Sequence, residues 1–379
     1  MGEYRLGLVG AGARGLGHLR STYRVRDQSY LHCESPIGHP HRIDHDYAES
    51  AREWAMETSD LEPNVTAVCD PNEAARTEAV NLCGEHGDAP TAFESFGRFL
   101  ECDAYDAAIV ATPNDYHARQ TKGLLDRDIS VFSEKPIGIT IAEHDDLIAA
   151  DQAAGGTLFV GFNLRSSPFY TRLKELIDAG AFGDLGMIGC REARGHFHAE
   201  YSFATDRSGG TLLDKNCHDF DLFNWYADAD PVRVAAFGGQ HFHSTNTDVN
   251  DQSVVIIEYD TGLLASLELC MYAPFGERTR MYALRGTEGL LRARKETGEA
   301  DLFRRGSRDT IRVSGPQGGH GGADVVQMVR FLRFLAGDAD RPADPVDAKK
   351  ADAIALAAER AITDRTMVEL DSNYNLITP

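Results

Sequence analysis

The chain has 379 residues, which is enough for two domains of ordinary size. Its composition is 42% hydrophobic and 26% charged, which excludes a largely disordered or fibrous protein. Lys and Arg number 38 against 59 Asp and Glu, and the net charge of −21 disfavours nucleic acid and anionic membranes as partners. No apolar run approaches the ~18 residues of a membrane span, and the first residues lack a signal-peptide pattern. We therefore expect a cytoplasmic protein.

The charged residues are also unevenly distributed by type. The chain contains 7 Lys against 31 Arg, and 35 Asp against 24 Glu. An acidic, lysine-poor composition of this kind would keep a protein soluble in a salt-rich cytoplasm. Adaptation to high salt is therefore a hypothesis that a stability measurement can test.

Strands and helices alternate in the first part of the chain. We expect strands at 4–10, 64–70, 106–112, 129–134 and 157–163, and helices from 13 to 22 and at 72–86, 115–126 and 141–154. This alternation predicts a doubly wound parallel sheet. The polar stretch 22–63 is too long for a normal connection, and we treat it as an insertion.

The pattern changes after about residue 164. Strand-like runs follow one another at 186–198, 232–241, 252–259, 263–273, 279–286 and 289–294, with helices at 168–179, 214–226, 323–336 and 348–363. Successive strands joined by short turns predict a mostly antiparallel sheet. We accordingly expect a first domain at 1–163 and a second at 164–379.

A glycine-rich turn joins the first expected strand to the first expected helix. Gly10 permits a tight turn, Gly12 lets the backbone approach a pyrophosphate, and Gly15 allows close packing of helix and strand. The second strand ends at Asp70, whose carboxylate could accept hydrogen bonds from adenosine ribose hydroxyls. The alternative is a simple glycine turn with a strand-end aspartate. Because Asp70 would repel a 2′-phosphate, the pattern favours NAD over NADP.

Two further groups of polar residues follow later strands, at the sheet edge where doubly wound folds bind ligands. The stretch after one strand contains Thr112, Pro113, Asn114 and His117, and the stretch after the next contains Glu134 and Lys135. An exposed lysine is the alternative interpretation of Lys135.

A third group lies at the start of an expected helix in the second domain. Asp214 and His218 are four residues apart, so they lie on one face of a helix and could form an acid/base pair. The alternative is a helix-start aspartate favoured by the helix dipole together with a hydrogen-bonded histidine.

Taken together, these motifs resemble the family of glucose-fructose oxidoreductase, inositol dehydrogenase and rhizopine-catabolism proteins (Gfo/Idh/MocA). The matching segments occur in order as GAGARG at 10–15, CDPN at 69–72, ATPNDYH at 111–117, EKP at 134–136, GFNLR at 161–165 and GGTLLDKNCHDFD at 209–221. The resemblance implies an N-terminal Rossmann domain and a C-terminal α/β domain with a large open, mostly antiparallel sheet. It also implies a bound nicotinamide cofactor and a homodimer or homotetramer.

The resemblance implies a catalytic group formed by Lys135, Asp214 and His218. A neutral imidazole suits removal of a hydroxyl proton, so His218 is the expected base, with Lys135 stabilising alkoxide character and Asp214 orienting the substrate. Cofactor-binding residues are expected at Gly10, Gly12, Ala13, Arg14, Gly15, Asp70, Thr112, Pro113, Asn114, His117, Glu134, Lys135 and Arg165, and substrate-binding residues at Lys135, Asn163, Asp214 and His218.

The expected activity is that of an NAD(P)-dependent dehydrogenase acting on a secondary hydroxyl of a sugar, sugar acid or cyclitol. Two alternatives come from the same resemblance. One is a redox glycosidase, which cleaves a glycosidic bond through a transient oxidation. The other is a dinucleotide-sensing regulator without catalysis, which the joint presence of Lys135, Asp214 and His218 disfavours.

Two features depart from the family pattern. Many members have glycine two residues after the aspartate of the helix motif, whereas this chain has Asn216, preceded by Lys215.

The insertion carries several potential zinc ligands, but it contains no regular ligand motif, and we favour a structural or oligomer-contact role over a metal site. These residues are His32, Cys33, His39, His41 and His45. The His-Phe-His runs at 196–198 and 241–243 are interpreted as solvated or interface faces, and no metal is expected.

Overall fold

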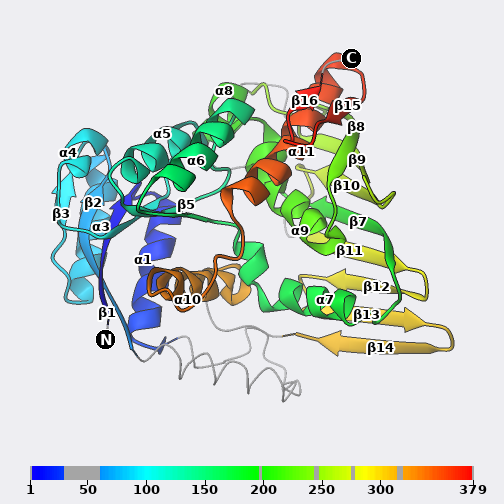
Figure 1. The fold of residues 1–379 in the computed structure, drawn as a ribbon, viewed down its shortest axis with the longest axis horizontal. Coiled ribbons are helices and arrows are strands. Elements are labelled where there is room, and N and C mark those ends of the chain that lie inside the picture. The colour runs from blue at the N-terminus through cyan, green and yellow to red at the C-terminus, as the bar shows by residue number, and fades with distance from the viewer. Residues whose placement is uncertain are drawn as a thin grey trace. The chain divides into compact units, whose positions relative to one another are not determined.

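The computed structural model describes residues 2–29, 60–195, 199–242, 247–274, 278–313 and 319–377. The histidines and the cysteine of the insertion, the run 196–198 and His243 lie outside the described residues. The chain forms two compact units (Figure 1). Unit 1 comprises Met1–Gly138, Ala142–Pro168 and Ser314–Val346, and unit 2 comprises Ile139–Ile141, Phe169–Val313 and Asp347–Pro379.

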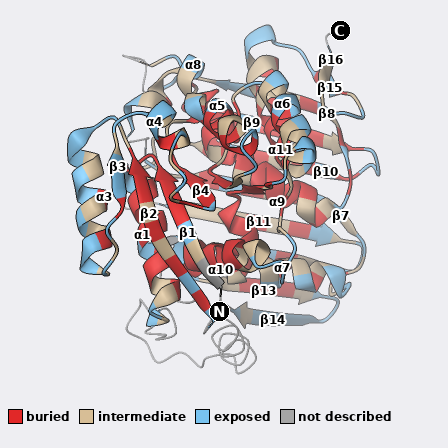
Figure 2. Ribbon diagram, turned by 60° about the vertical axis from the view of Figure 1, so that its left-hand side comes forward, coloured by how far each residue is buried: buried red, intermediate tan, exposed pale blue. Residues whose placement is uncertain are grey.

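Unit 1 contains a six-stranded sheet in which all strand pairs are parallel. The order β3-β2-β1-β4-β5-β6 is that of a doubly wound dinucleotide-binding fold, which confirms the predicted architecture. The strands are β1 (Gly2–Val9), β2 (Leu61–Cys69), β3 (Thr91–Phe93), β4 (Ala107–Val110), β5 (Ser130–Ser133) and β6 (Leu158–Val160). The central strands are buried along most of their length (Figure 2), as their apolar sequences require.

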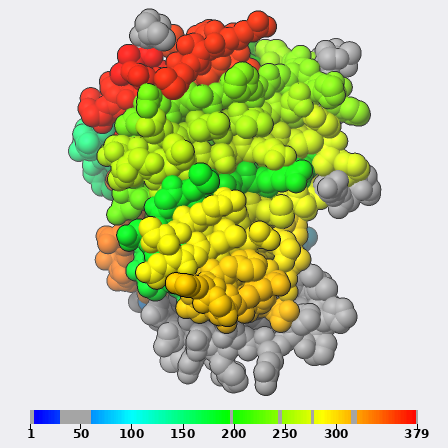
Figure 3. Space-filling model, turned by 90° about the vertical axis from the view of Figure 1, so that its right-hand side faces the viewer, coloured from blue at the N-terminus to red at the C-terminus, as the bar shows by residue number. Residues whose placement is uncertain are grey.

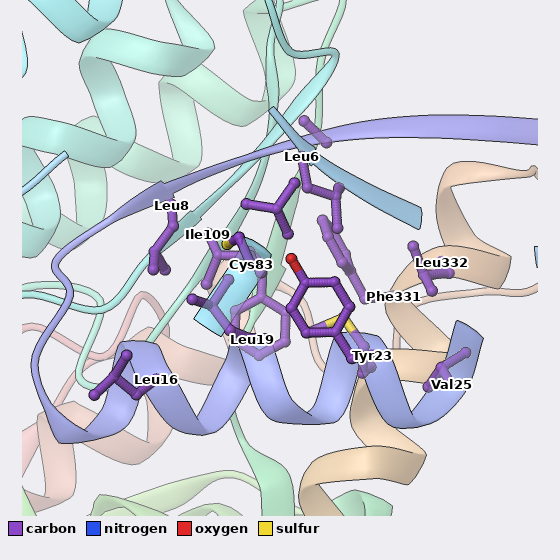
Figure 4. Close-up of a cluster of buried hydrophobic side chains, with 14 of the residues drawn as sticks. Leu6, Leu8, Leu16, Leu19, Tyr23, Val25, Cys83, Ile109, Phe331 and Leu332 are labelled. Atoms are coloured by element: carbon purple, nitrogen blue, oxygen red, sulfur yellow. The ribbon is translucent and has the colours of Figure 1, made fainter. Parts of the chain in front are cut away.

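Helices cover this sheet. They are α1 (Ala13–Arg26), α3 (Glu73–Glu85), α4 (Phe96–Leu100), α5 (Asn114–Leu125), α6 (Ile141–Ala153) and, from much later in the chain, α10 (Ala323–Leu335). Figure 4 shows Phe331 and Leu332 of α10 in one hydrophobic cluster with Leu19 and Tyr23 of α1. Helix α10 falls within the range predicted for the second domain, but it belongs to unit 1, because it buries its apolar face against α1.

Unit 2 contains a ten-stranded sheet in the order β14-β13-β12-β11-β7-β10-β9-β8-β15-β16. Among the strand pairs of the described residues in this sheet, only β7–β10 is parallel, so the prediction of a large, mostly antiparallel sheet is confirmed. The strands are β7 (Leu185–Ala193), β8 (Pro231–Gly239), β9 (Gln252–Tyr259), β10 (Leu264–Cys270), β11 (Thr279–Gly286), β12 (Gly289–Arg294), β13 (Glu299–Arg304), β14 (Ser307–Arg312), β15 (Val368–Leu370) and β16 (Leu376–Ile377).

The two faces of the central strands differ in burial. On β9, Val255 and Ile257 are buried while Val254 and Ile256 are exposed. Three longer helices accompany the sheet, α7 (Pro168–Asp178), α9 (Cys217–Ala227) and α11 (Pro345–Asp364). The Tyr259 hydroxyl of β9 donates to Asn224 of α9 at 2.9 Å, which ties that helix to the buried face. Among the helices in the described ranges, none is long and apolar enough to cross a membrane.

Candidate active site

The glycine-rich turn of unit 1 contains three glycines with different requirements. Gly10 has φ of +93°, and a Cβ there would lie 2.5 Å from the Ala111 carbonyl oxygen. A Cβ on Gly15 would lie 1.9 Å from the Gly10 carbonyl oxygen, so the tight turn and the helix–strand packing both require glycine. Gly12 is exposed, and a Cβ there would meet no described protein atom within 4 Å. Its small size therefore leaves an open approach to the backbone at this point.

Helix α1 begins beside this open approach, with Gly12 as its N-cap and Ala13 as its first residue. The helix start has no side-chain cap and no acidic residue in its first turn. Backbone N–H groups and the positive end of the helix dipole are suited to a pyrophosphate. The residues present thus fit a dinucleotide cofactor.

Asp70 follows β2 at the same edge of the sheet. Its two carboxylate oxygens accept from the backbone N–H groups of Ala11 at 2.7 Å and Asn72 at 2.8 Å. The side chain is half-buried, and each oxygen retains a further lone pair. Asp70 therefore holds the glycine turn and remains able to accept from ribose hydroxyls.

The side chain of Arg14 is held by two carboxylates. Its Nε lies 2.5 Å from Glu134 Oε1, and its Nη1 lies 3.0 Å from Asp324 Oδ2. Burial opposes ionisation of Glu134, but the charge of Arg14 and a hydrogen bond with His18 lower its pKa well below its usual value. Burial and the charge of Arg14 lower the pKa of His18. The half-buried Arg14 and the buried Glu134 therefore form an ionised pair next to the glycine turn.

The residues after β4 and β5 are joined by His117. Its ring nitrogens lie 2.7 Å from the carbonyl oxygens of Thr112 and Pro136, and burial lowers its pKa. Pro113 precedes α5, whose first residue, Asn114, is buried. His117 thus connects the two loops rather than pointing into solvent.

Lys135 lies in the second of these loops. Its side chain is half-buried, its backbone N–H donates to Glu134 Oε2 at 3.2 Å, and the Lys135–Pro136 peptide bond is cis. The lysine is therefore not the fully exposed residue of the alternative interpretation.

Asn163 and Arg165 lie in a short 3-10 helix, Asn163–Ser166, that follows β6, and both are buried. Asn163 donates to Asp324 Oδ1 at 3.0 Å, and Arg165 donates to the Pro342 carbonyl oxygen at 2.7 Å. Asp324 also contacts His320 at 2.9 Å. Sequence reasoning assigned no role to Asp324 or His18. The HGGAD run at 320–324 was the available signal for Asp324, and His18 stands one helical turn after Arg14.

In unit 2, the segment before the expected acid/base pair is fixed by glycines and a buried carboxylate. Gly209 and Gly210 have φ of +80° and +98°. Glu359 of α11 accepts from the Leu212 backbone N–H at 2.9 Å and from Asn250 Nδ2 at 2.7 Å. These contacts hold the first residues of the helix that carries Asp214 and His218.

Asp214 lies in a π-helical turn, η4 (Leu212–Asn216), and His218 in the first turn of α9. A π-helical turn is wider than an α-helical one and is frequent at functional sites. Asp214 is buried and His218 is half-buried. These two residues belong to unit 2, whereas Lys135 belongs to unit 1.

A buried polar network supports this turn. Asn216 Nδ2 lies 2.8 Å from Asp219 Oδ2 and 3.0 Å from Glu192 Oε2, and Arg280 Nη2 lies 3.1 Å from both of these oxygens. Tyr282 also donates to Asp219. The asparagine that replaces the family glycine therefore bridges two buried carboxylates, which a glycine could not do.

Lys215 belongs to the same network. Its Nζ lies 3.2 Å from Glu192 Oε1. Burial and the charge of Arg280 lower the pKa of Lys215 to about 8. Burial opposes ionisation of Glu192, yet the charges of Arg280 and Lys215 lower its pKa to about 2. Within the described part of the chain, no group of three or more His, Cys, Asp or Glu side chains could hold a metal ion.

Comparisons with known protein families match both parts of the chain. Residues 4–162 match the model of an oxidoreductase family with an NAD-binding Rossmann fold, and residues 170–292 match the GFO/IDH/MocA C-terminal domain. The chain belongs to the Gfo/Idh/MocA family. Unit 1 is accordingly an NAD-binding Rossmann domain, and the family resemblance inferred from the motifs is confirmed.

Curated Gfo/Idh/MocA relatives include dehydrogenases of several polyols and sugars. The chain is 29% identical to scyllo-inositol 2-dehydrogenase (NAD⁺) of Bacillus subtilis over 50% of this chain and 55% of that protein. It is 27% identical to rhizopine catabolism protein MocA of Rhizobium meliloti, over 62% and 61%. It is 26% identical to D-xylose 1-dehydrogenase (NADP⁺) 2 of Haloferax volcanii, over 61% and 68%. The matched segments thus span about half to two thirds of these relatives.

Solved structures share the fold over nearly the whole chain. An oxidoreductase domain protein from Kribbella flavida has a TM-score of 0.81 at 18% identity, with 98% of this chain and 100% of that chain covered. Levoglucosan dehydrogenase in complex with NADH has a TM-score of 0.80 at 16% identity, with 97% and 99% covered. At these identities the likeness establishes the fold alone.

Proposed function

We propose that this protein is a cytoplasmic NAD-dependent dehydrogenase that oxidises a secondary hydroxyl of a sugar, sugar acid or cyclitol. The observation that carries the proposal is the combination of an open, uncapped start of α1 at Gly12 with acid/base residues in both units. Lys135 follows β5 beside the ionised Glu134, and Asp214 and His218 occupy the anchored turn before and within α9. The inositol and sugar dehydrogenases among the family relatives support the same class of reaction.

The proposed chemistry requires a proton acceptor and a group that stabilises negative charge on oxygen. A nicotinamide cofactor held at the start of α1 beside Gly12 would supply the acceptor for the hydride of the carbinol carbon. The His218 imidazole takes the hydroxyl proton, and the Lys135 ammonium group donates a hydrogen bond to the same oxygen. The Asp214 carboxylate accepts a hydrogen bond from a neighbouring substrate hydroxyl and so orients the ring.

The test is NADH formation, followed by absorbance, with a panel of inositols, aldoses, sugar acids and deoxysugars. NAD⁺ and NADP⁺ are run in parallel. Strong turnover of one compound class supports the proposal and defines the cofactor preference. Release of a free sugar from a glycoside without net NADH formation would indicate a redox glycosidase. Tight NAD binding with no turnover of any compound would indicate a regulator.

We further propose a homodimer or homotetramer formed through the open face of the unit 2 sheet. Figure 3 shows this face, with β7 in green between the yellow-green strands β10 and β9 and the yellow strands β11 and β12. Several large apolar side chains are exposed on the four neighbouring strands β7, β10, β9 and β8, namely Met187, Phe237, Val254, Ile256 and Leu264. Register pairs such as Leu264 with Met187 and Phe237 with Val254 place them on the same side of the sheet. An exposed apolar face of this extent is typical of a protein–protein interface.

A further inference from the structure

Unit 2 contains a concentration of positive charge around Asp214 that contrasts with the charge of −21 on the whole chain. We call it the basic cluster, and it consists of Arg194, Lys215, Arg278 and Arg280. Three carboxylates lie among these cations, namely Glu192, Asp214 and Asp219. The described residues of the cluster therefore carry four positive groups against three negative ones.

The deeper part of the cluster is internally compensated. Arg280 has a side chain only 11% exposed, and its Nη2 lies 3.1 Å from carboxylate oxygens of both Glu192 and Asp219. Lys215 shares Glu192 with Arg280, and its side chain is 14% exposed. Lys295 also interacts with Arg280, and the charge of Glu296 opposes the effect of Arg280 and of burial on the pKa of Lys295. A single carboxylate, Glu192, thus serves two buried cations.

The outer part of the cluster consists of Arg194 and Arg278, which are less tightly paired than Arg280 within the described residues. Arg194 and Arg278 immediately adjoin the last residue pair of the β7–β11 ladder, Ala193 with Thr279. Among the described residues, neither arginine forms an ion pair with a carboxylate. Arg194 interacts electrostatically with Asp214, Glu192, Arg278 and Arg280. Among the described residues, the four cations of the cluster thus exceed its three carboxylates by one positive charge.

We propose that the basic cluster binds a carboxylate on the substrate, so that the substrate is a sugar acid, such as an aldonate or a uronate, rather than a neutral polyol. The inference rests on the proposed function, because it specifies the compound class that the dehydrogenase oxidises. Lys215 directly follows Asp214 in the chain, and Arg194 interacts with Asp214. A carboxylate bound there is held close to the residue that orients the substrate hydroxyls.

The proposal also explains why a lysine and an asparagine stand in the family motif here. A charge-assisted hydrogen bond from a partly buried cation is stronger than one from a neutral donor. Asn216 holds Glu192 and Asp219 in position, so that these carboxylates offset Arg280 without neutralising the whole cluster. A neutral substrate would leave the surplus charge without a partner in the complex.

The first experiment uses the unmodified protein with NAD⁺ and matched substrate pairs, D-gluconate with D-glucitol and D-glucuronate with D-glucose, and myo-inositol as a further neutral compound. We expect at least one acid to have a kcat/KM at least tenfold higher than its neutral partner. Equal or higher efficiency with the neutral partners overturns the carboxylate proposal while the dehydrogenase proposal stands. No NADH from any compound contradicts the dehydrogenase proposal itself.

The second experiment tests the cluster through Lys215→Met and Arg194→Gln. We expect each to raise KM for the acid at least tenfold and to change KM for its neutral partner less than twofold. Arg194 is half-buried at a strand end, so its replacement tests the cluster even if the lysine variant does not fold.

Lys350→Met is the matched control. Its side chain is also 14% exposed and pairs with one carboxylate, Asp230, at 2.6 Å, but it lies on α11 outside the cluster. It should leave the KM of both compounds unchanged. If Lys215→Met and Arg194→Gln raise KM for acid and neutral substrates equally, the cluster only supports the structure of the site. It then does not bind the substrate carboxylate, and the proposal is wrong.

Discussion

Glu192 is the residue on which the buried charges of unit 2 depend most directly. Lys215, Arg280 and Asn216 all donate to its two oxygens. Glu192→Gln removes the negative charge and leaves two buried cations with one carboxylate fewer. Because an uncompensated buried charge is costly, we expect the free energy of unfolding at neutral pH to fall by about 3 kcal/mol. Denaturant unfolding measures this loss, and Glu175→Gln, in an exposed helical pair, is the control with little effect.

The same carboxyl group contributes a pH dependence of known sign. Its pKa is about 2 in the folded protein against an ordinary value of 4.5, so the stabilisation is complete above 4.5. It is lost as the pH falls through 4.5 towards 2. Between pH 7 and pH 3, the free energy of unfolding should therefore fall more steeply in the unmodified protein than in Glu192→Gln. Parallel curves for the two proteins would show that Glu192 is not the residue responsible.

His218 allows a sharper test of the proposed chemistry. Replacement of an imidazole base by an amide removes the proton acceptor but keeps the size of the side chain. We expect His218→Gln to lower kcat by about 10²- to 10⁴-fold while the dissociation constant of NAD⁺ stays unchanged. The control is His86→Gln, since His86 stacks on Tyr23 in unit 1 and has no proposed role in the reaction. Unchanged turnover in His218→Gln would remove His218 from the role of base.

At the scale of elements, the turn that carries Asp214 depends on Gly210. An alanine there would adopt φ near +98°, and its Cβ would lie 2.7 Å from Glu359 Oε1, the atom that accepts from the Leu212 N–H. We expect Gly210→Ala to reduce the free energy of unfolding by about 2 to 4 kcal/mol and to lower kcat/KM, since both strain and displacement of Glu359 act on the same turn.

Gly262→Ala separates the two causes. Gly262 has φ of +84° but open space around its Cβ position, so the variant suffers the backbone strain of about 1 to 2 kcal/mol without a steric clash. Circular dichroism under denaturant and steady-state kinetics measure both effects. If the two variants lose equal stability and activity, the contact with Glu359 is not what anchors the turn.

The sequence predicted best those elements that have a strong hydrophobic pattern and whose ends are determined by adjacent residues. The order of strand, glycine turn and helix follows from adjacent residues, and α1 starts at Ala13 as expected. Strand β3 has three residues and only a partly buried pattern, so it gave no signal. The placement of α10 in unit 1 depends on a hydrophobic cluster that Phe331 shares with residues more than 300 positions earlier, such as Leu19, and periodicity cannot reveal it.

The site residues also divide into those that adjacent residues explain and those that depend on contacts between distant segments. The glycines and Asp70 could be proposed from the sequence because each has a positional reason within a strand–turn–helix unit. The partners of Asn216 and Lys215 could not, because Glu192 lies on β7 and Arg280 on β11, and only the strand register brings them together. Asn216 and Lys215 could be recognised in the sequence as departures from the family motif. Their contacts could be identified only from the folded structure.

At the scale of the whole molecule, the acidic surface predicts an unusual response to salt. Repulsion among the excess carboxylates destabilises the compact state, and raising the salt concentration from 0.1 M to 1 M shortens the screening length from about 10 Å to about 3 Å. We expect the midpoint of thermal unfolding to rise over this range, because the repulsion is spread over the surface whereas pairs such as Glu192 with Arg280 are buried. Scanning calorimetry at several NaCl concentrations measures the trend. A midpoint that falls with added salt would contradict adaptation to high salt.

The open sheet face makes a prediction about assembly. A stable dimer needs about 800 Å² of buried surface on each partner, and an apolar face across the four strands β7, β10, β9 and β8, with Val254 on β9, could supply it. Val254→Glu places a charge in that face, which the unassembled protein tolerates because the side chain is exposed but which an interface would have to desolvate. We expect sedimentation to show an oligomer for the unmodified protein and mainly monomer for the variant.

Val346→Glu makes the same substitution at an exposed valine on α11, outside this face, and should remain oligomeric. A monomeric unmodified protein, or an oligomer that persists in Val254→Glu, would mean that this face does not mediate self-association.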